Sequence, residues 1–161
     1  YKGKPIHPFL IEKLSTRNTE SAPVVVTIDI AAGSDFEHSK VEKRNGGWWT
    51  EEGESPIDYH GFWYKWLGKL ANGWHVVEAG ANGGGTGFVM DLMFLRVSQG
   101  KIIYSDNRHA KQILLTVVQT KALGDHYEGD IKVFPNNKVV IPASTNQSGG
   151  GAIDKDVELK F

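Results

Sequence analysis

The segment that most constrains the fold lies at residues 88–97 and reads Phe-Val-Met-Asp-Leu-Met-Phe-Leu-Arg-Val. Side chains along a β-strand alternate between its two faces. Alternation here puts large apolar side chains on both faces, with Asp91 as the exception. A strand that is apolar on both faces belongs at the centre of a sheet that is covered on each side. We therefore expect a layered β-structure built around this segment.

A glycine-dense segment, residues 80–87 (Gly-Ala-Asn-Gly-Gly-Gly-Thr-Gly), directly precedes this strand. A phosphate-binding P-loop needs a lysine followed by serine or threonine, and it opens a helix. No lysine follows here, and the next residues predict a strand. We therefore interpret the segment as a turn or bulge that lets the central sheet form, because glycine accepts positive φ angles and close backbone approach.

Other runs of β-branched and aromatic residues are separated by turn signals at close intervals. They predict strands at residues 24–30, 62–70, 74–79, 101–104, 113–118, 130–134, 138–141 and 157–161. Turns are expected at Asn72-Gly73, at residues 98–100 and at residues 135–137. Residues 8–14 predict a short helix that begins with Pro8. The pattern indicates a mostly β fold, an antiparallel β-sandwich or barrel-like domain with a short N-terminal helix.

The length of 161 residues and the hydrophobic fraction of 40% fit a single β-rich domain over residues 1–161. Residues 35–59 differ from the rest, because charged and polar residues dominate there around Gly46-Gly47 and Trp48-Trp49. We interpret residues 35–59 as a long polar and aromatic excursion, or an irregular edge hairpin. Excursions of this length are frequently binding elements.

Composition excludes several classes of function. The 18 Lys and Arg are balanced by 19 Asp and Glu. The chain therefore has no excess of positive charge that would attract a nucleic acid, and we predict no nucleic-acid partner. The absence of cysteine excludes disulfides and thiolate sites, and no apolar run is long enough for a transmembrane segment. The six histidines lack metal-ligand spacing, and no nucleophile or cofactor motif occurs. We therefore predict no metal site, no cofactor and no catalytic residue, and the oligomeric state stays open.

All five tryptophans fall between residues 48 and 74. Aromatic faces stack on sugar rings or hold the side chains of a partner protein. Trp48 and Trp49 are the best candidates for exposure, because glycines and glutamates flank them. We predict a binding site for a ligand or partner at Trp48, Trp49, Glu51, Glu52, Trp63 and His60.

Catalysis by the acidic residues of the excursion is the alternative to binding. A glycosidase uses two carboxylates, and Glu51, Glu52 and Asp58 are close in sequence to the aromatic residues. This alternative requires two carboxylates that converge on a pocket. A third option is a structural domain of the cell envelope. Whether the chain is an enzyme stays open, and the balance favours a domain that is not.

Three short motifs resemble a pattern found in uncharacterised exported bacterial proteins. They are Gly83-Gly84-Gly85-Thr86-Gly87-Phe88, Asp91-Leu92-Met93-Phe94-Leu95 and Leu123-Gly124-Asp125-His126-Tyr127-Glu128-Gly129-Asp130-Ile131. In that pattern arginine is common where this chain has His126. The resemblance implies a secreted or lipid-anchored β-rich domain, and it implies no catalytic role for any residue of this chain. In physical terms, we expect Asp125 to accept backbone N–H bonds in a tight turn and to position the strand at residue 130.

Together these observations predict a non-catalytic extracytoplasmic domain that recognises a protein or a glycan, for example an inhibitor or immunity-type protein. The sequence begins with Tyr1 rather than Met, which favours a processed, exported chain. We therefore expect a periplasmic or extracellular location, reached from a secreted or lipoprotein precursor.

Overall fold

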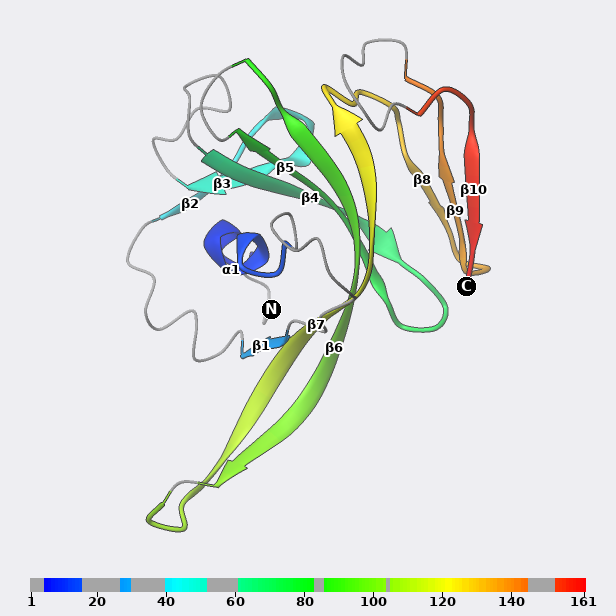
Figure 1. Cartoon of the computed structure of the whole chain (residues 1–161). Helices are drawn as coiled ribbons and strands as arrows, with labels where there is room; N and C mark the ends of the chain where they lie inside the picture. The colour runs from blue at the N-terminus through cyan, green and yellow to red at the C-terminus, as the bar shows by residue number, and fades with distance from the viewer. Residues whose placement is uncertain are drawn as a thin grey trace.

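The computed structural model (Figure 1) describes residues 5–15, 27–29, 40–51, 61–82, 86–103, 105–144 and 153–161. Over these residues the chain is mostly β, with two antiparallel sheets and one short α-helix, α1 (Pro8–Glu12). The prediction of an antiparallel, sandwich-like fold with a short N-terminal helix is confirmed. Among the described residues, no α-helix has the length and apolar character needed to cross a bilayer.

The larger sheet has seven strands in the order β1-β7-β6-β5-β4-β3-β2. Their bounds are β1 (Thr27–Asp29), β2 (Val41–Lys43), β3 (Trp49–Glu51), β4 (Gly61–Lys69), β5 (His75–Asn82), β6 (Val89–Ile103) and β7 (His109–Asp125). The smaller sheet has the order β10-β9-β8, with β8 (Lys132–Phe134), β9 (Lys138–Ile141) and β10 (Val157–Lys160). The larger sheet is thus built from residues 27–125 and the smaller sheet from residues 132–160.

The larger sheet is covered on both sides. The face that α1 covers, here called the helix face, buries Met93 and Leu95 of β6 under the helix. The opposite face, here called the sheet face, buries Leu92 and Phe94 of the same strand against the smaller sheet. Figure 1 shows α1 and the smaller sheet on opposite sides of the curved larger sheet. The prediction of a central strand covered on each side is confirmed for residues 90–95, whereas Val89 and Val97 at the two ends of the predicted segment are exposed.

The helix α1 begins where local chemistry favours it. Pro8 occupies the first turn, where its missing N–H and fixed φ are tolerated. The Nδ1 atom of His7 accepts the otherwise unpaired N–H of Phe9 at 3.3 Å. Leu14 and Ile11 are fully buried on the helix face, so packing against the sheet stabilises a helix too short to persist alone.

The hairpin turns follow the residues that tolerate positive φ. Gly73 has a φ of 89° between β4 and β5, and Asn137 has a φ of 60° between β8 and β9. Both turns lie where they were predicted. Within the predicted excursion, β2, the short 3-10 turn η1 (Asn45–Gly47) and β3 form an edge hairpin of the larger sheet. Residues 35–39 and 52–59 of that excursion lie outside the described part of the chain.

The predicted turn at residues 98–100 is wrong. β6 continues through these residues to Ile103, and residues 98–100 pair with residues 112–114 of β7. A Cβ on Gly100 would lie 2.9 Å from Cδ1 of Leu114. Glycine here makes room for a side chain of the neighbouring strand and does not turn the chain.

Candidate functional site

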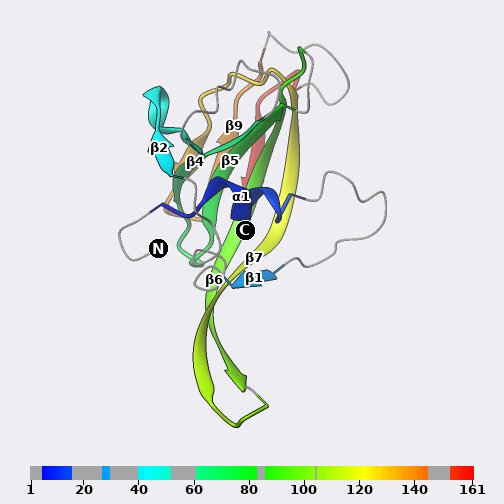
Figure 2. The ribbon, with the colours of Figure 1, turned by 90° about the vertical axis from the view of Figure 1, so that its left-hand side faces the viewer.

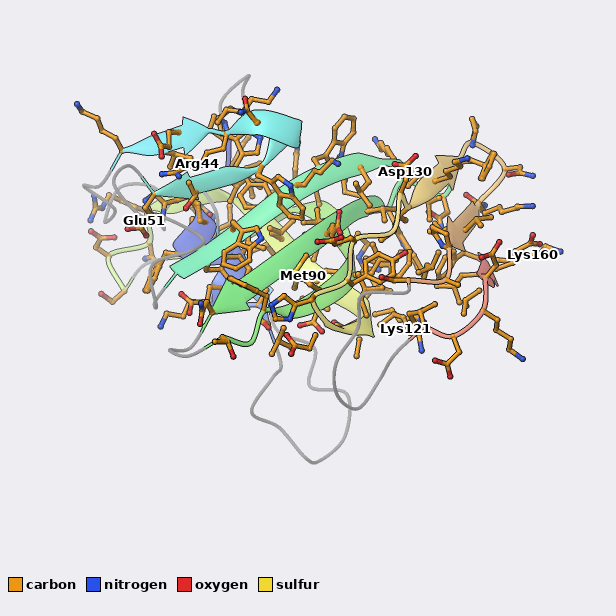
Figure 3. All side chains as sticks on the ribbon, turned by 90° about the horizontal axis from the view of Figure 1, so that it is seen from above. Arg44, Glu51, Met90, Lys121, Asp130 and Lys160 are labelled. Atoms are coloured by element: carbon orange, nitrogen blue, oxygen red, sulfur yellow. The ribbon has the colours of Figure 1, made fainter. Side chains whose placement is uncertain are left out.

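A pocket of about 600 Å³ opens on the sheet face, between the β2–β3 hairpin and the segments that flank β6 and β7. It is lined by Arg44, Asn45, Trp48, Thr50, Trp63, Phe88, Met90, His126, Tyr127 and Glu128. Arg44 and Met90 are labelled in Figure 3, which views the molecule from above. The volume lies within the range of small-molecule sites.

Trp63 lies against the backbone of the neighbouring strand and lines the bottom of the pocket. Its partner in register on β5 is Gly80. A Cβ on Gly80 would come within 2.4 Å of Nε1 and Cε2 of the indole, so a glycine is needed to leave room for the ring. Gly80 opens the glycine-dense segment, and its role is to let the Trp63 indole lie close to the sheet.

Phe88 is held beside Trp63 by the residues that end β7. Its N–H donates to Oδ1 of Asp125 at 2.6 Å, and its carbonyl oxygen accepts from the N–H of His126 at 2.9 Å. The Phe88 ring packs edge to face against His126, with centroids 4.7 Å apart, and against Trp63 at 5.8 Å. The prediction that Asp125 accepts a backbone N–H is confirmed. This bond anchors the segment before β6, whereas we expected the carboxylate to position the strand near residue 130.

The turn that carries His126 has an unusual backbone. His126 has a φ of 55° and Gly124 a φ of 96°. The left-handed conformation costs a non-glycine residue about 1–2 kcal/mol. Nδ1 of His126 lies 2.8 Å from Oδ1 of Asp125, and the side chain is about one-third exposed. Strain of this kind is concentrated at functional sites, where the surrounding structure holds it in place.

Charged groups surround the Trp48 side of the pocket. Nε of Arg44 donates to Oε1 of Glu42 at 2.7 Å, so the guanidinium is held next to the pocket by its own hairpin. The Lys65 ammonium lies 5.7 Å from the centroid of the Trp48 ring, within the range of a cation–π contact. The pocket lining therefore combines aromatic side chains with the ion-paired guanidinium of Arg44 and the carboxylate of Glu128.

Tyr127 forms part of the pocket wall, and its hydroxyl group has a hydrogen-bond partner within the protein. The hydroxyl donates to the carbonyl oxygen of Pro142 at 2.9 Å. A Cβ on Gly129 would lie 2.0 Å from that hydroxyl oxygen, so the glycine leaves room for the Tyr127 side chain. The aromatic ring of Tyr127 is thus presented to the pocket while its polar end links the two sheets.

Glu78 is buried on the sheet face, with 5% of its surface exposed. In the β4–β5 register it lies opposite Lys65. Burial raises the pKa of Glu78 to about 7, while Lys65 lowers the pKa and Asp130 raises it. Burial also raises the pKa of Tyr127, and the charge of Glu78 adds to that rise. A carboxyl group that exchanges its proton near neutral pH therefore lies close to the pocket wall.

Neighbouring tryptophans of the β2–β3 hairpin point to opposite faces of the sheet. Trp48 packs against the sheet-face core and lines the pocket, whereas Trp49 packs on the helix face, with the Lys43 ammonium 5.6 Å from its ring centroid. This follows from the alternation of an extended chain. Both are only partly exposed, and the most exposed tryptophan is Trp66 at 55%. The prediction that Trp48 and Trp49 are the exposed pair is therefore wrong.

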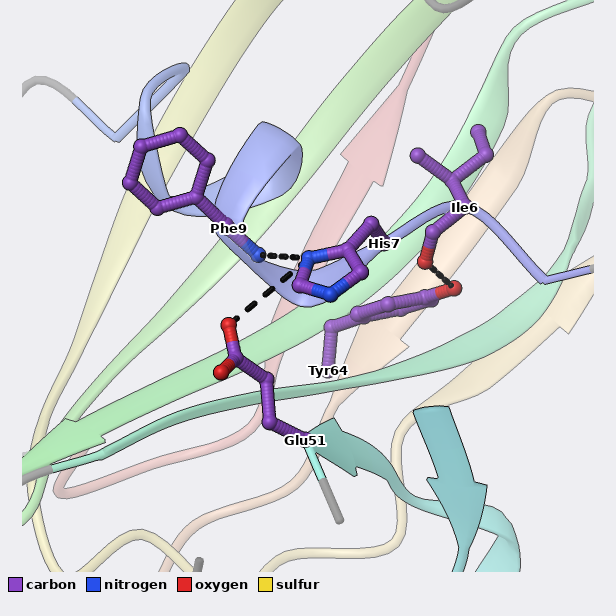
Figure 4. Close-up of polar contacts among 5 residues, drawn as sticks. All are labelled: Ile6, His7, Phe9, Glu51 and Tyr64. Atoms are coloured by element: carbon purple, nitrogen blue, oxygen red, sulfur yellow. Dashed lines mark hydrogen bonds and ion pairs between the residues drawn. The ribbon is translucent and has the colours of Figure 1, made fainter. Parts of the chain in front are cut away.

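Glu51 lies on the helix face, away from the pocket (Figure 4). Its Oε1 atom is 3.7 Å from Nδ1 of His7, which precedes α1. The neighbouring Tyr64 hydroxyl donates to the carbonyl oxygen of Ile6 at 2.6 Å, and burial raises the pKa of Tyr64. The Tyr64 hydrogen bond ties the N-terminal segment to the sheet, and Glu51 lies beside His7 at the start of α1.

The structure brings Trp48 and Trp63 together in the pocket and separates both from Trp49 and Glu51. The other two predicted site residues, Glu52 and His60, lie outside the described residues, as does Asp58. Within the described chain, no group of three or more histidine or acidic side chains is placed to hold a metal ion.

Most of the pocket lining was not predicted from the sequence, including Arg44, Phe88, His126, Tyr127 and Glu128. The turn at residues 123–126 was interpreted as a determinant of the fold alone. One signal could have indicated more: the Gly-Asp turn is followed directly by His, Tyr and Glu, three side chains that can bind a ligand.

We compared the chain with protein-family models, with curated proteins and with solved structures, and none of them matches it.

Proposed function

We propose that this chain is a non-catalytic binding domain whose pocket holds a short segment of a glycan. The observation that carries the proposal is the lining of one pocket by Trp48, Trp63 and Phe88, with Arg44 and Glu128 at its polar positions. Aromatic rings offer apolar faces to the C–H side of a sugar ring. The charged side chains supply donors and acceptors for its hydroxyl groups.

The size and position of the pocket support a small ligand over a flat protein surface. About 600 Å³ lies within the range of small-molecule sites, and three of the lining residues, Thr50, Trp63 and Met90, belong to strands of the larger sheet. The Trp63–Gly80 contact and the hydrogen bonds of Phe88 hold two of the aromatic rings in place before a ligand arrives. A preformed site loses less entropy on binding.

The same geometry gives less support to a carbohydrate-active enzyme. A glycosidase needs two carboxylates on opposite sides of the bond that is cleaved. Among the described residues that line the pocket, Glu128 is the one carboxylate, and Glu51 lies on the opposite face of the sheet. A periplasmic or extracellular location, which we also propose, would bring the pocket into contact with glycans of the cell envelope.

A glycan microarray, followed by fluorescence titration of the glycans that bind, tests the proposal. Trp48→Ala should weaken binding about tenfold to thirtyfold, because it removes one aromatic wall. Trp66→Ala is the matched control, since it removes an exposed tryptophan that does not line the pocket. Equal weakening by both variants, or no glycan bound by the wild-type protein, would contradict the proposal. Binding of a protein that Trp48→Ala abolishes would instead favour a protein partner.

A further inference from the structure

The ends of β6 and β7 extend beyond the rest of the fold as a two-stranded arm, defined here as residues 96–113 (Figures 1 and 2). β5 pairs with β6 as far as Leu95, and β1 pairs with β7 at residues 114–116. Beyond those points, the described strands show β6 and β7 paired with each other alone. A two-stranded ribbon is only marginally stable in water. The arm is therefore a candidate for contact with a partner.

The arm is basic, although the whole chain has a formal charge of −1. Its sequence contains Arg96, Lys101, Arg108 and Lys111 against Asp106 as its one acidic residue. Lys101 and Lys111 are directly opposite each other in the β6–β7 register, and both are exposed. Like charges at such a pair repel. A negatively charged surface placed against them would remove this repulsion.

The face of the arm that carries the two lysines also carries exposed apolar side chains. Ile103 follows Lys101 by two residues and so lies on the same face. It is 63% exposed, the most exposed large hydrophobic residue in the described chain. Val97, on the same face, is 43% exposed. The end of the arm thus combines an apolar side chain with a pair of cations.

We propose that this face of the arm docks on a membrane surface that contains anionic lipids. Lys101 and Lys111 meet the phosphate groups of the lipids, while Ile103 enters the boundary between headgroups and acyl chains. Interfacial segments bind by this combination of apolar burial and attraction to anionic headgroups. Duplex DNA would also neutralise the lysines, but it would leave Ile103 in water. The apolar end of the arm therefore favours a lipid surface.

Vesicle co-sedimentation of the full chain tests this docking. We expect binding to vesicles of phosphatidylcholine mixed with phosphatidylglycerol, much weaker binding to phosphatidylcholine alone, and loss of binding at high salt. The double variant Lys101→Gln/Lys111→Gln should bind the mixed vesicles about thirtyfold more weakly. Ile103→Ser, which keeps every charge, should bind about tenfold more weakly.

Matched controls lie outside the arm. Lys132→Gln/Lys155→Gln removes the same charge from exposed positions, and Phe134→Ser removes an exposed apolar side chain from β8. Both controls should bind like the wild-type protein, and circular dichroism checks that every variant is folded. Three results would overturn the proposal: equal binding to neutral vesicles, equal loss in the control variants, or binding to labelled duplex DNA but not to vesicles.

Discussion

On the helix face of the larger sheet, α1 packs directly over the core, and the nearby Tyr64 hydroxyl donates to the carbonyl oxygen of Ile6. On the sheet face, the smaller sheet covers only part of the surface and leaves a pocket of about 600 Å³ beside Trp48 and Trp63. The same strands β3 and β4 build both faces, because alternate residues point in opposite directions. One face therefore closes the fold, and the other remains available for a ligand.

Polar groups differ between the two faces in the same way. On the helix face, the buried Tyr64 hydroxyl donates a hydrogen bond to the carbonyl oxygen of Ile6 in the N-terminal segment. On the sheet face, Glu78 is buried deeply enough that its pKa rises to about 7. A buried carboxyl group with a raised pKa lowers stability at neutral pH. We infer that the buried charge of Glu78 makes the sheet face less stable near the pocket than the helix face.

The largest effect should come from Glu78→Gln. The pKa of Glu78 is raised from 4.5 to about 7 by burial, so folding takes up a proton between these values. The stability that this proton contributes is fully present below pH 4.5 and is lost as the pH rises through about 7. The loss reaches about 3 kcal/mol in the limit. Urea unfolding across this pH range should show Glu78→Gln gaining stability relative to the wild-type protein as the pH rises.

Glu12→Gln is the control for this experiment, because it removes an exposed carboxylate of α1 beside the helix face. Its difference from the wild-type protein should stay nearly constant with pH. If the difference in unfolding free energy between Glu78→Gln and the wild-type protein were also independent of pH, burial of Glu78 would not destabilise the sheet face. The inferred contrast between the two faces would then be contradicted.

The next effect is expected at the glycine under the pocket. Gly80→Ala places a methyl group within 2.4 Å of the Trp63 indole, so the ring must move. We expect a loss of about 2 kcal/mol of unfolding free energy and a changed near-ultraviolet circular dichroism signal. Gly87→Ala is the matched control from the same segment, since its Cβ would lie at an ordinary 3.7 Å from the Asp125 carboxylate. Equal stability of the two variants would show that the packing of the Trp63 indole does not require a glycine at position 80.

The smallest effects compare one tyrosine on each face. Tyr64→Phe removes a hydrogen bond to Ile6, and Tyr127→Phe removes one to Pro142. Each change should cost about 1 kcal/mol, because it leaves a carbonyl oxygen without its donor. Hydrogen exchange should show that Tyr64→Phe loosens the segment around α1, whereas Tyr127→Phe loosens the smaller sheet. Loosening of the same amides by both variants would mean that the two faces are not independent.

The strands could be predicted because their signals are local. The predicted hairpin at Asn72-Gly73 matches the structure, and so does the beginning of the central strand predicted at residues 88–97, although β6 continues to Ile103. The wrong turn at residues 98–100 has a physical cause. Glycine is typical of turns, but it also occurs within strands where a neighbouring side chain comes close, and the Leu114 side chain of β7 lies against Gly100.

The site was predicted only in part. Trp48 and Trp63, which the aromatic composition indicated, line the candidate pocket, but composition could not separate Trp48 from Trp49. That separation depends on which face of the edge hairpin is turned towards the pocket. Phe88 and His126 were missed because they meet through a backbone pairing between segments nearly forty positions apart.

The antiparallel, mostly β fold around a strand that is apolar on both faces follows from local sequence patterns, since alternation and turn residues act over a few positions. The face that carries the pocket, the need for glycine at Gly80 and the contact of the Asp125 turn with Phe88 follow from contacts between distant segments. These features depend on register between strands. A shift of register by one residue would exchange the two faces, and no local pattern records which partner lies opposite.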